Sequence, residues 1–225
     1  MERNVSLEEI SDGRLYGLND MVKADCNDCT GCSACCQGMG NSILLDPLDI
    51  FRFTGKLHMT FEELLIDKIE LNVVDGIILP NLKMTGKTEK CVFLNEKGRC
   101  RIHSFRPGIC RLFPLGRYYQ NRSFRYFLQV HECQKGNKTK IKVRKWIDTV
   151  DVKKNEQYIA EWHYFLLDLQ KKMKSNTDTM LMKQISMYVL QNFFISEYDT
   201  NAEFYSQFQE RMEKAKNSLC GEVKQ

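Results

Sequence analysis

The cysteines of this 225-residue chain constrain its fold more than any other feature. Nine of the ten lie between Cys26 and Cys133, and only Cys220 stands apart. Two thiolates three positions apart in a tight turn can bind one centre, which is why this spacing recurs in zinc and iron–sulfur sites. The first group follows the pattern C-x2-C-x2-C-C and consists of Cys29, Cys32, Cys35 and Cys36.

A second group of cysteines lies farther along the chain, at Cys91, Cys100, Cys110 and Cys133. Residues 91–103 read as a β-hairpin turning at 95–98, so Cys91 and Cys100 are expected on neighbouring strands. Cys110 follows a rigid turn that contains Pro107. Ligands so far apart in the sequence meet only when the chain folds, so metal binding and folding are expected to be one process.

Several neighbouring residues have a secondary place in this prediction. If their loop is extended, Cys35 and Cys36 leave the backbone in roughly opposite directions, so that they would serve different centres or one would support the centre indirectly. Cys26 is an extra candidate ligand. His103 forms C-x2-H with Cys100 and would either bind zinc or close the hairpin. Cys220 is expected to bind no metal. The same holds for the histidines at positions 58, 131 and 163. Among the arginines of the second segment, Arg106 is the one expected to offset thiolate charge, because Pro107 fixes the local chain.

Three interpretations of the cysteines compete: disulfides, zinc and an iron–sulfur cluster. Residues 1–9 have no apolar core, and no run approaches 18 apolar residues, so neither a secretory signal nor a transmembrane helix is expected. The default compartment is then the reducing cytoplasm, where stable disulfides are rare. Structural zinc takes four ligands, so eight thiolates could hold two ions.

A [4Fe–4S] cluster also takes four thiolates, and C-x2-C-x2-C with one remote cysteine is a ferredoxin-like arrangement. The ferredoxin motif places proline directly after the remote cysteine, and no such pair occurs here. Thiolates alone do not choose between zinc and iron, so both stay open at this point.

The rest of the sequence predicts an α+β fold. Asp46 and Pro47 predict the start of one helix, and Thr60 with Glu63 predicts a capping box for a second, whose apolar positions run from Phe61 to Ile69. Residues 77–79 predict a strand, and residues 117–128 predict a hairpin.

After residue 150 the apolar residues recur with the helical period up to about residue 215, and Asn201 is the expected cap of the last helix. Residues 1–25 read as a short lead-in. We therefore expect a metal-binding domain over residues 1–150, built of short hairpins and helices. A helical region over 151–225 is expected to pack on it.

Charge gives little sign of a nucleic-acid partner, because 33 basic residues face 29 acidic ones and the net charge is only +4. The lysine-rich run 135–145 is best explained as a solvated linker or an edge strand. Nucleic-acid binding is the weaker alternative, since no aromatic platform accompanies the run.

The order of motifs resembles the YkgJ-type cysteine-cluster family, which is described as a zinc- or iron-chelating domain. The resemblance spans roughly residues 26–133 and is carried by Cys29–Cys36, Ile43–Arg52, Cys91–Leu94, Gly98–Cys100, Ile102-His103, Arg106-Pro107 and Cys110–Pro114. It implies metal ligands at Cys29, Cys32, Cys35, Cys36, Cys91, Cys100, Cys110 and Cys133. One branch of the family resembles flagellin lysine N-methylases, which use S-adenosylmethionine.

The leading hypothesis is a cytoplasmic protein that holds an iron–sulfur cluster, [4Fe–4S], through these cysteines. The alternatives are a zinc-stabilised interaction module, whose helical half would contact a protein partner, and an S-adenosylmethionine-dependent lysine methylase. Spacing predicts metal binding, whereas a redox or enzymatic use of the centre has no separate motif. The C-x3-C-x2-C spacing that is usual in radical S-adenosylmethionine enzymes does not occur.

Overall fold

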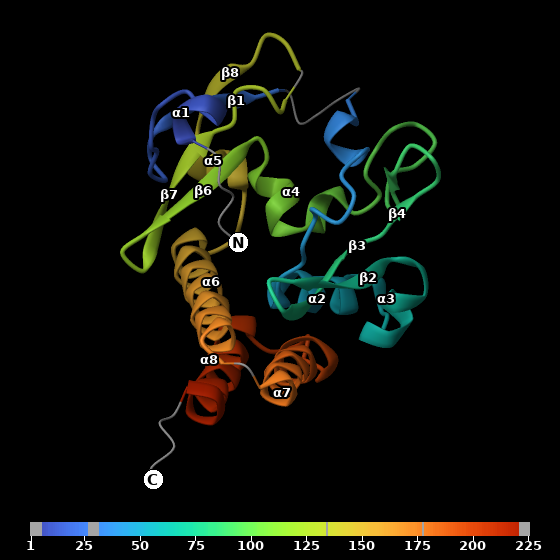
Figure 1. Ribbon diagram of the computed structural model, residues 1–225. Helices are drawn as coiled ribbons and strands as arrows, with labels where there is room; N and C mark the ends of the chain where they lie inside the picture. The colour runs from blue at the N-terminus through green and yellow to red at the C-terminus, as the bar shows by residue number, and fades with distance from the viewer. Residues whose placement is uncertain (1–5, 27–31, 134, 177, 221–225) are drawn as a thin grey trace. The chain divides into compact units, whose positions relative to one another are not determined.

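The computed structural model describes residues 6–26, 32–133, 135–176 and 178–220 (Figure 1). The fold is mixed, with small β-hairpins in the N-terminal half and long helices in the C-terminal half, which confirms the α+β prediction. The chain forms two compact units. The helical unit contains residues 44–83 and 162–225, and the hairpin unit contains residues 2–43 and 84–161. The predicted domain boundary at residue 150 stays a prediction.

The helical unit joins a central segment of the chain to the C-terminal helices. Helix α6 begins in the hairpin unit and ends in this one. The elements of the helical unit are α2 (Pro47–Leu57), α3 (Phe61–Asp67), β2 (Ile69–Val74), β3 (Ile77–Leu82), the C-terminal part of α6 (Val152–Lys174), α7 (Thr179–Leu190), the π-helical turn η3 (Gln191–Ile195), α8 (Phe204–Ala215) and a second π-helical turn η4 (Lys216–Cys220).

Helices α2 and α3 begin where the capping residues predict. The Asp46 carboxylate accepts a hydrogen bond from Asp49 N at 3.0 Å, and the reciprocal bond completes a capping box. Thr60 and Glu63 form the same box at α3. The predicted apolar face of α3 was wrong at one position, because the helix ends at Asp67 and Ile69 already begins β2.

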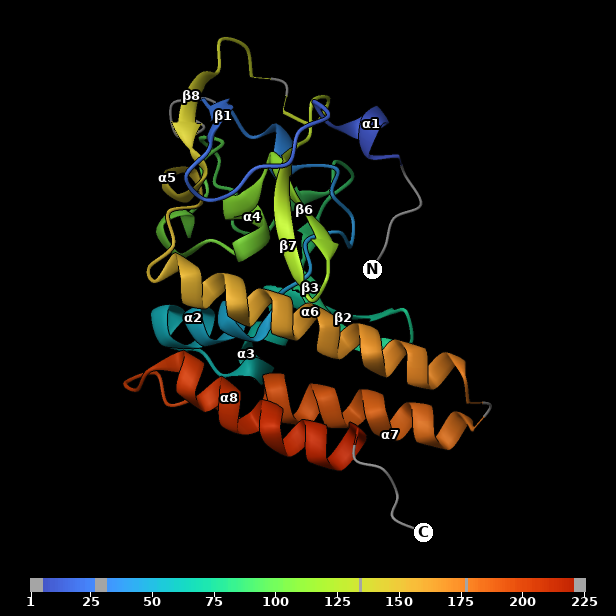
Figure 2. The same cartoon turned by 90° about the vertical axis from the view of Figure 1, so that its left-hand side faces the viewer.

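Aromatic packing forms the core of the helical unit. The Trp162 ring lies 5.0 Å from Phe193 between centroids, Phe193 lies 5.9 Å from Phe208, and all three side chains are buried. The Ser186 hydroxyl of α7 accepts a hydrogen bond from Ile78 N of β3 at 2.8 Å, which attaches the antiparallel pair β2–β3 to that helix. Figure 2 shows α7 and α8 side by side.

One predicted cap was wrong at the start of α8. The Glu203 carboxylate, not the Asn201 side chain, accepts from Ser206 N, so the helix begins two residues later than Asn201 would place it. The helical periods themselves are confirmed, since α6, α7 and α8 all form.

The hairpin unit consists of short elements. They are α1 (Leu7–Ile10), β1 (Met21–Asp25), the 3-10 turn η1 (Ala34–Cys36), β4 (Met84–Thr85), β5 (Lys90–Cys91), the 3-10 turn η2 (His103–Phe105), α4 (Gly108–Leu112), β6 (Leu115–Gln120), β7 (Ser123–Leu128), β8 (Thr139–Lys142), α5 (Val143–Ile147) and the start of α6.

Two strand pairs enclose the core of the hairpin unit. Strands β6 and β7 form the predicted hairpin, closed by Asn121 and Arg122 at positive φ. Strand β8 lies in the lysine-rich run and pairs with β1, which agrees with the edge-strand interpretation. Buried side chains from several elements meet between them, namely Tyr16, Val22, Ala24, Leu112, Leu115, Tyr126, Leu128, Val143 and Ile147.

Residues 6–25 therefore do more than lead into the fold. Tyr16 exchanges backbone hydrogen bonds with Tyr126 of β7 at 2.7 and 3.0 Å, and the next stretch forms strand β1. The sequence signal was the alternation of Val22 and Ala24, both buried, with exposed neighbours. Within the described residues, no helix combines the length and the apolar character needed to cross a bilayer.

Candidate metal centre

The first cysteine group is held by a turn and by a contact with a distant segment. Cys36 N donates to Ser33 O at 2.9 Å, which closes the 3-10 turn η1. Immediately afterwards Gln37 forms an isolated β-bridge with Lys90, and Gly38 N donates to Glu89 O at 3.1 Å. This bridge brings the chain beside Cys36 to the residue that precedes Cys91, so the two cysteine groups meet.

The second group begins with the predicted turn at residues 95–98, but Cys91 and Cys100 lie in different strand pairings. Strand β5, which contains Cys91, pairs with β4, whereas Leu94 and Cys100 form an isolated antiparallel bridge beside which Arg101 N donates to Phe93 O at 2.8 Å. The carboxamide of Asn95 holds the turn by accepting from Arg99 N at 2.9 Å and Lys97 N at 3.0 Å. These side-chain hydrogen bonds add to the backbone bond from Asn95 N to Arg99 O at 2.9 Å.

Gly98 closes the same turn in a conformation that favours glycine, with φ of +67°. A Cβ atom at this position would lie 3.6 Å from Ser33 Oγ. The turn before Cys100 therefore packs against the residue next to Cys32, which adds a second contact between the two cysteine groups.

Cys110 lies on the short helix α4, which a buried arginine holds in place. Arg111 is 7% exposed, and its guanidinium donates to three backbone carbonyls, those of Ser104, Arg106 (3.2 Å) and Asp148 (2.9 Å). These bonds join α4 to the η2 turn and to the end of α5. Nothing local in the sequence signals that Arg111 is buried.

Neighbouring thiols perturb one another in this region. The Cys36 thiol donates a hydrogen bond to Cys35, and this contact raises the pKa of Cys36, followed by burial and by the nearby thiols of Cys35, Cys110 and Cys91. The same bond lowers the pKa of Cys35 to about 7. The extended loop in which Cys35 and Cys36 would point in opposite directions is not formed, because a 3-10 turn takes its place.

Arginine charge reaches the same group of thiols. Burial raises the pKa of Cys91 and Cys100, and the charges of Arg106 and Arg99 oppose this effect at Cys100. Arg106 also contributes to the lowered pKa of Cys35. The expected charge-offsetting position of Arg106 is confirmed.

His103 faces that same arginine. Its ring nitrogens are in hydrogen-bonding contact with Arg106 Nη1, which lies 2.8 Å from Nδ1. This contact favours the structural role of His103 over metal ligation, since a ligating nitrogen would have to turn away from a cation.

Five candidate ligands therefore gather, namely Cys35, Cys36, Cys91, Cys100 and Cys110. Cys32 lies in the first loop, and Cys133 lies after β7, where its carbonyl accepts from Lys138 Nζ at 2.8 Å. Cys29 falls outside the described residues. Over the described ranges, no three cysteine, histidine or carboxylate side chains are arranged to hold a metal ion. The full ligand set stays a prediction.

The donor chemistry nevertheless fits a metal or cluster. None of the cysteines described near either group forms a disulfide bond. These are Cys26, Cys32, Cys35, Cys36, Cys91, Cys100, Cys110 and Cys133. Thiolate is the donor that zinc and iron–sulfur centres share. The partial convergence is what coupled folding and binding would produce, because such ligands reach their final positions when the centre forms.

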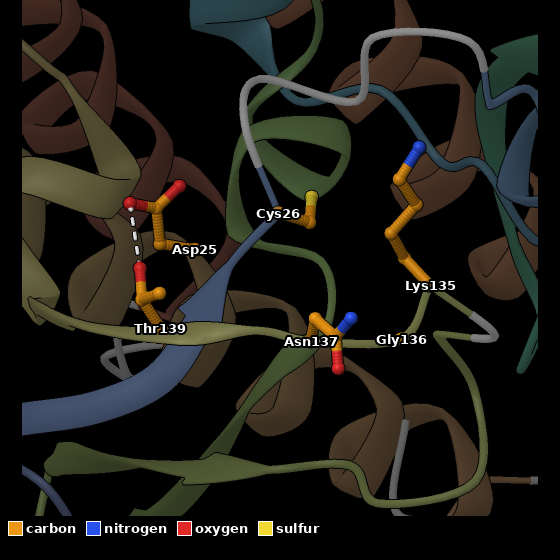
Figure 3. A pocket seen from close by; sticks show the side chains of 6 residues that line it. All are labelled: Asp25, Cys26, Lys135, Gly136, Asn137 and Thr139. Carbon is orange, nitrogen blue, oxygen red and sulfur yellow. Dashed lines mark hydrogen bonds between the residues drawn. The ribbon is translucent and has the colours of Figure 1, made fainter.

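A cavity of about 500 Å³ opens beside the buried Cys26. Figure 3 shows the Cys26 thiol and the Lys135 side chain at the same opening, with Asn137 below them. The Asp25 carboxylate instead accepts a hydrogen bond from Thr139 at 3.2 Å. Cys26 thus lines a hollow between the ends of β1 and β8 whose described lining includes no other cysteine, and its role as an extra ligand stays a prediction.

Comparison with known proteins identifies the class to which this site belongs. Residues 28–149, more than half of the chain, match the CxxCxxCC family, described as a "Putative zinc- or iron-chelating domain". The chain belongs to this family, and the site is a metal-binding cysteine cluster.

Among individual proteins, an uncharacterized protein of Methanocaldococcus jannaschii, MJ0661, is 31% identical over 115 residues. The match covers 48% of this chain and 58% of that protein, so the chain spans little more than half of its relative. No solved structure matches the chain.

Proposed function

We propose that this protein holds a [4Fe–4S] cluster through thiolates of both cysteine groups. The main support for this proposal is the Gln37–Lys90 bridge, which brings the loop of Cys35 and Cys36 to the strand of Cys91. The candidate ligands are Cys29, Cys32, Cys35, Cys36, Cys91, Cys100, Cys110 and Cys133.

One feature supports iron–sulfur over zinc, and the further cysteines are compatible with either metal. The opening C-x2-C-x2-C offers three thiolates in a tight loop, which is the ferredoxin-like way of holding one cluster. Beyond the four thiolates that one cluster needs, the remaining cysteines would stay available in the shell around it or for a second centre. A bound cluster would supply one-electron chemistry, while the chain holds it in place and lets the positive charge of Arg106 offset the thiolates.

The same family description also names zinc, so a zinc-stabilised module is the second candidate. In that case the centre would be structural, and the helical unit would contact a protein partner. Lysine methylation with S-adenosylmethionine stays a prediction from resemblance. A cytoplasmic location is part of the proposal, because reduced thiols are needed for either metal.

Anaerobic purification with iron, zinc and acid-labile sulfide measured together tests the proposal. We expect about four iron and four sulfide per chain, with brown colour and visible absorbance. Cys36→Ser and Cys110→Ser should lose most of the iron, whereas Cys220→Ser, outside both groups, should keep it. Zinc without sulfide would support the second candidate instead, and neither metal would refute both.

A further inference from the structure

A cavity in the helical unit lies apart from all the cysteines discussed above. It has a volume of about 240 Å³ and is formed where α2 ends, α3 begins and the η3 turn passes into the loop before α8. Its buried lining is apolar and comes from Ile50, Phe61 and Phe194. Its polar lining residues, His58, Thr60, Glu197 and Thr200, are exposed. An apolar floor with a polar rim is the usual construction of a small-molecule site.

Tyr198 gives this cavity a specific polar group. Its side chain lines the cavity and is only 7% exposed, yet its hydroxyl proton has no hydrogen-bond acceptor among the residues that the structure describes, because the Arg211 guanidinium beside it can only donate. Buried polar groups in folded proteins almost always have a partner, so such a hydroxyl needs an explanation. Burial raises the pKa of Tyr198, which keeps the hydroxyl protonated and able to donate.

The surrounding structure fixes the position of that ring. The Arg211 guanidinium lies over the ring of Tyr198, 3.6 Å from its centroid. The same guanidinium donates to the carbonyls of Asn192 (2.8 Å), Ser196 (2.6 Å) and Glu197. Arg211 therefore holds both the ring and the η3 turn that forms one wall of the cavity.

The η3 turn is a second, independent sign of a site. Its Phe194 and Ile195 line the cavity, and η3 is a π-helical turn at the end of α7. Single π-helical turns are rare in proteins as a whole, and those that occur often lie at functional sites. The opposite wall turns at His58, whose φ of 55° is unusual for a residue other than glycine.

We propose that this cavity binds a small, uncharged molecule with an apolar body and a hydrogen-bond acceptor, such as a carbonyl oxygen, that meets the Tyr198 hydroxyl. The volume lies below the roughly 300–1,000 Å³ that holds drug-sized ligands, so the molecule is compact. The inference does not rest on the metal centre, because every lining residue belongs to the helical unit.

Acetophenone is a suitable probe, since it combines an aromatic body with one carbonyl. It is titrated into the full, metal-loaded chain while 13C-methyl NMR signals of Ile50, Met59 and Ile195 are followed. We expect saturable shifts of these lining methyls in the millimolar range, with weaker binding of ethylbenzene, which lacks the carbonyl. No shift, or equal binding of both compounds, would overturn the proposal.

Tyr198→Phe separates ligand binding from a structural role of the hydroxyl. It should weaken acetophenone binding about 2- to 10-fold, as expected for one hydrogen bond, and leave ethylbenzene binding unchanged. Tyr188→Phe, the same change outside the cavity lining, should affect neither. The thermal midpoint of Tyr198→Phe should match that of the wild type. A clear fall in that midpoint would mean that the hydroxyl has a structural partner, and it would refute the inference.

Thr54→Met tests the cavity itself by lengthening a lining side chain. We expect it to abolish the methyl shifts caused by acetophenone while the iron or zinc content stays that of the wild type. Unchanged acetophenone binding in this variant would place the probe elsewhere and contradict the proposal.

Discussion

Replacing Arg111 with methionine should destabilise the protein more than any other single arginine substitution near the cysteines. Three charge-assisted hydrogen bonds to backbone carbonyls are lost, each worth about 1.5–3 kcal/mol. Two of the three acceptors belong to exposed residues, Ser104 and Asp148, so water can replace the guanidinium there. Methionine also removes the cost of burying a charge. The net loss is about 2–4 kcal/mol of unfolding free energy.

Urea unfolding of the metal-loaded protein measures this loss directly, and thermal unfolding gives a second readout. A chain of this size loses about 2–4 °C in melting temperature per kcal/mol, so the expected fall is about 4–16 °C. Arg101→Met, at an exposed position of the same segment, is the matched control. If both variants unfold at the same urea concentration, Arg111 does not hold α4 in the way described.

Three further variants test other parts of the fold. Asp46→Ala removes the capping bond to Asp49 N and should cost about 0.5–2 kcal/mol in urea unfolding; no loss would show that the box is dispensable. Ser186→Ala leaves Ile78 N without its acceptor and should cost about 1–3 kcal/mol, whereas a neutral result would require another acceptor. Burial raises the pKa of Glu156, so the folded protein holds this proton more tightly than the unfolded chain does. The free energy of unfolding of the wild type should therefore fall as pH rises through the raised pKa. Glu156→Gln should remove this fall and be the more stable protein at pH 8, and parallel pH profiles would contradict that reasoning.

Local signals predicted helix starts well and distant pairings poorly. The boxes at Asp46 and Thr60 depend on residues three positions apart, so the sequence contains all the information needed. The pairing of β1 with β8 joins segments more than 100 residues apart, and no local pattern specifies such a partner. Glu203, not Asn201, caps α8. Either side chain could serve as a cap, and the choice depends on how the helix packs.

In the candidate site, too, local sequence patterns were informative and contacts set by the fold were not. Cysteine spacing predicted the candidate ligands, which stay a prediction, and Arg106 lies close enough to influence Cys35 and Cys100 as expected. The close contact of Cys35 with Cys36 was missed, because it depends on a 3-10 turn that spacing alone does not reveal. The buried position of Arg111 was missed as well, since its acceptors are backbone carbonyls that any sequence provides.

The bridge between Gln37 and Lys90 joins two segments that are synthesised at different times. The loop of Cys36 leaves the ribosome 74 residues before Cys110, and the intervening residues 44–83 fold into the helical unit. At about 5–20 residues per second, the early thiols wait roughly 4–15 s for their partners. During that interval they are open to oxidants and to competing metal ions. A centre that takes ligands from both groups, as proposed above, would therefore be complete only after the second group of cysteines has emerged.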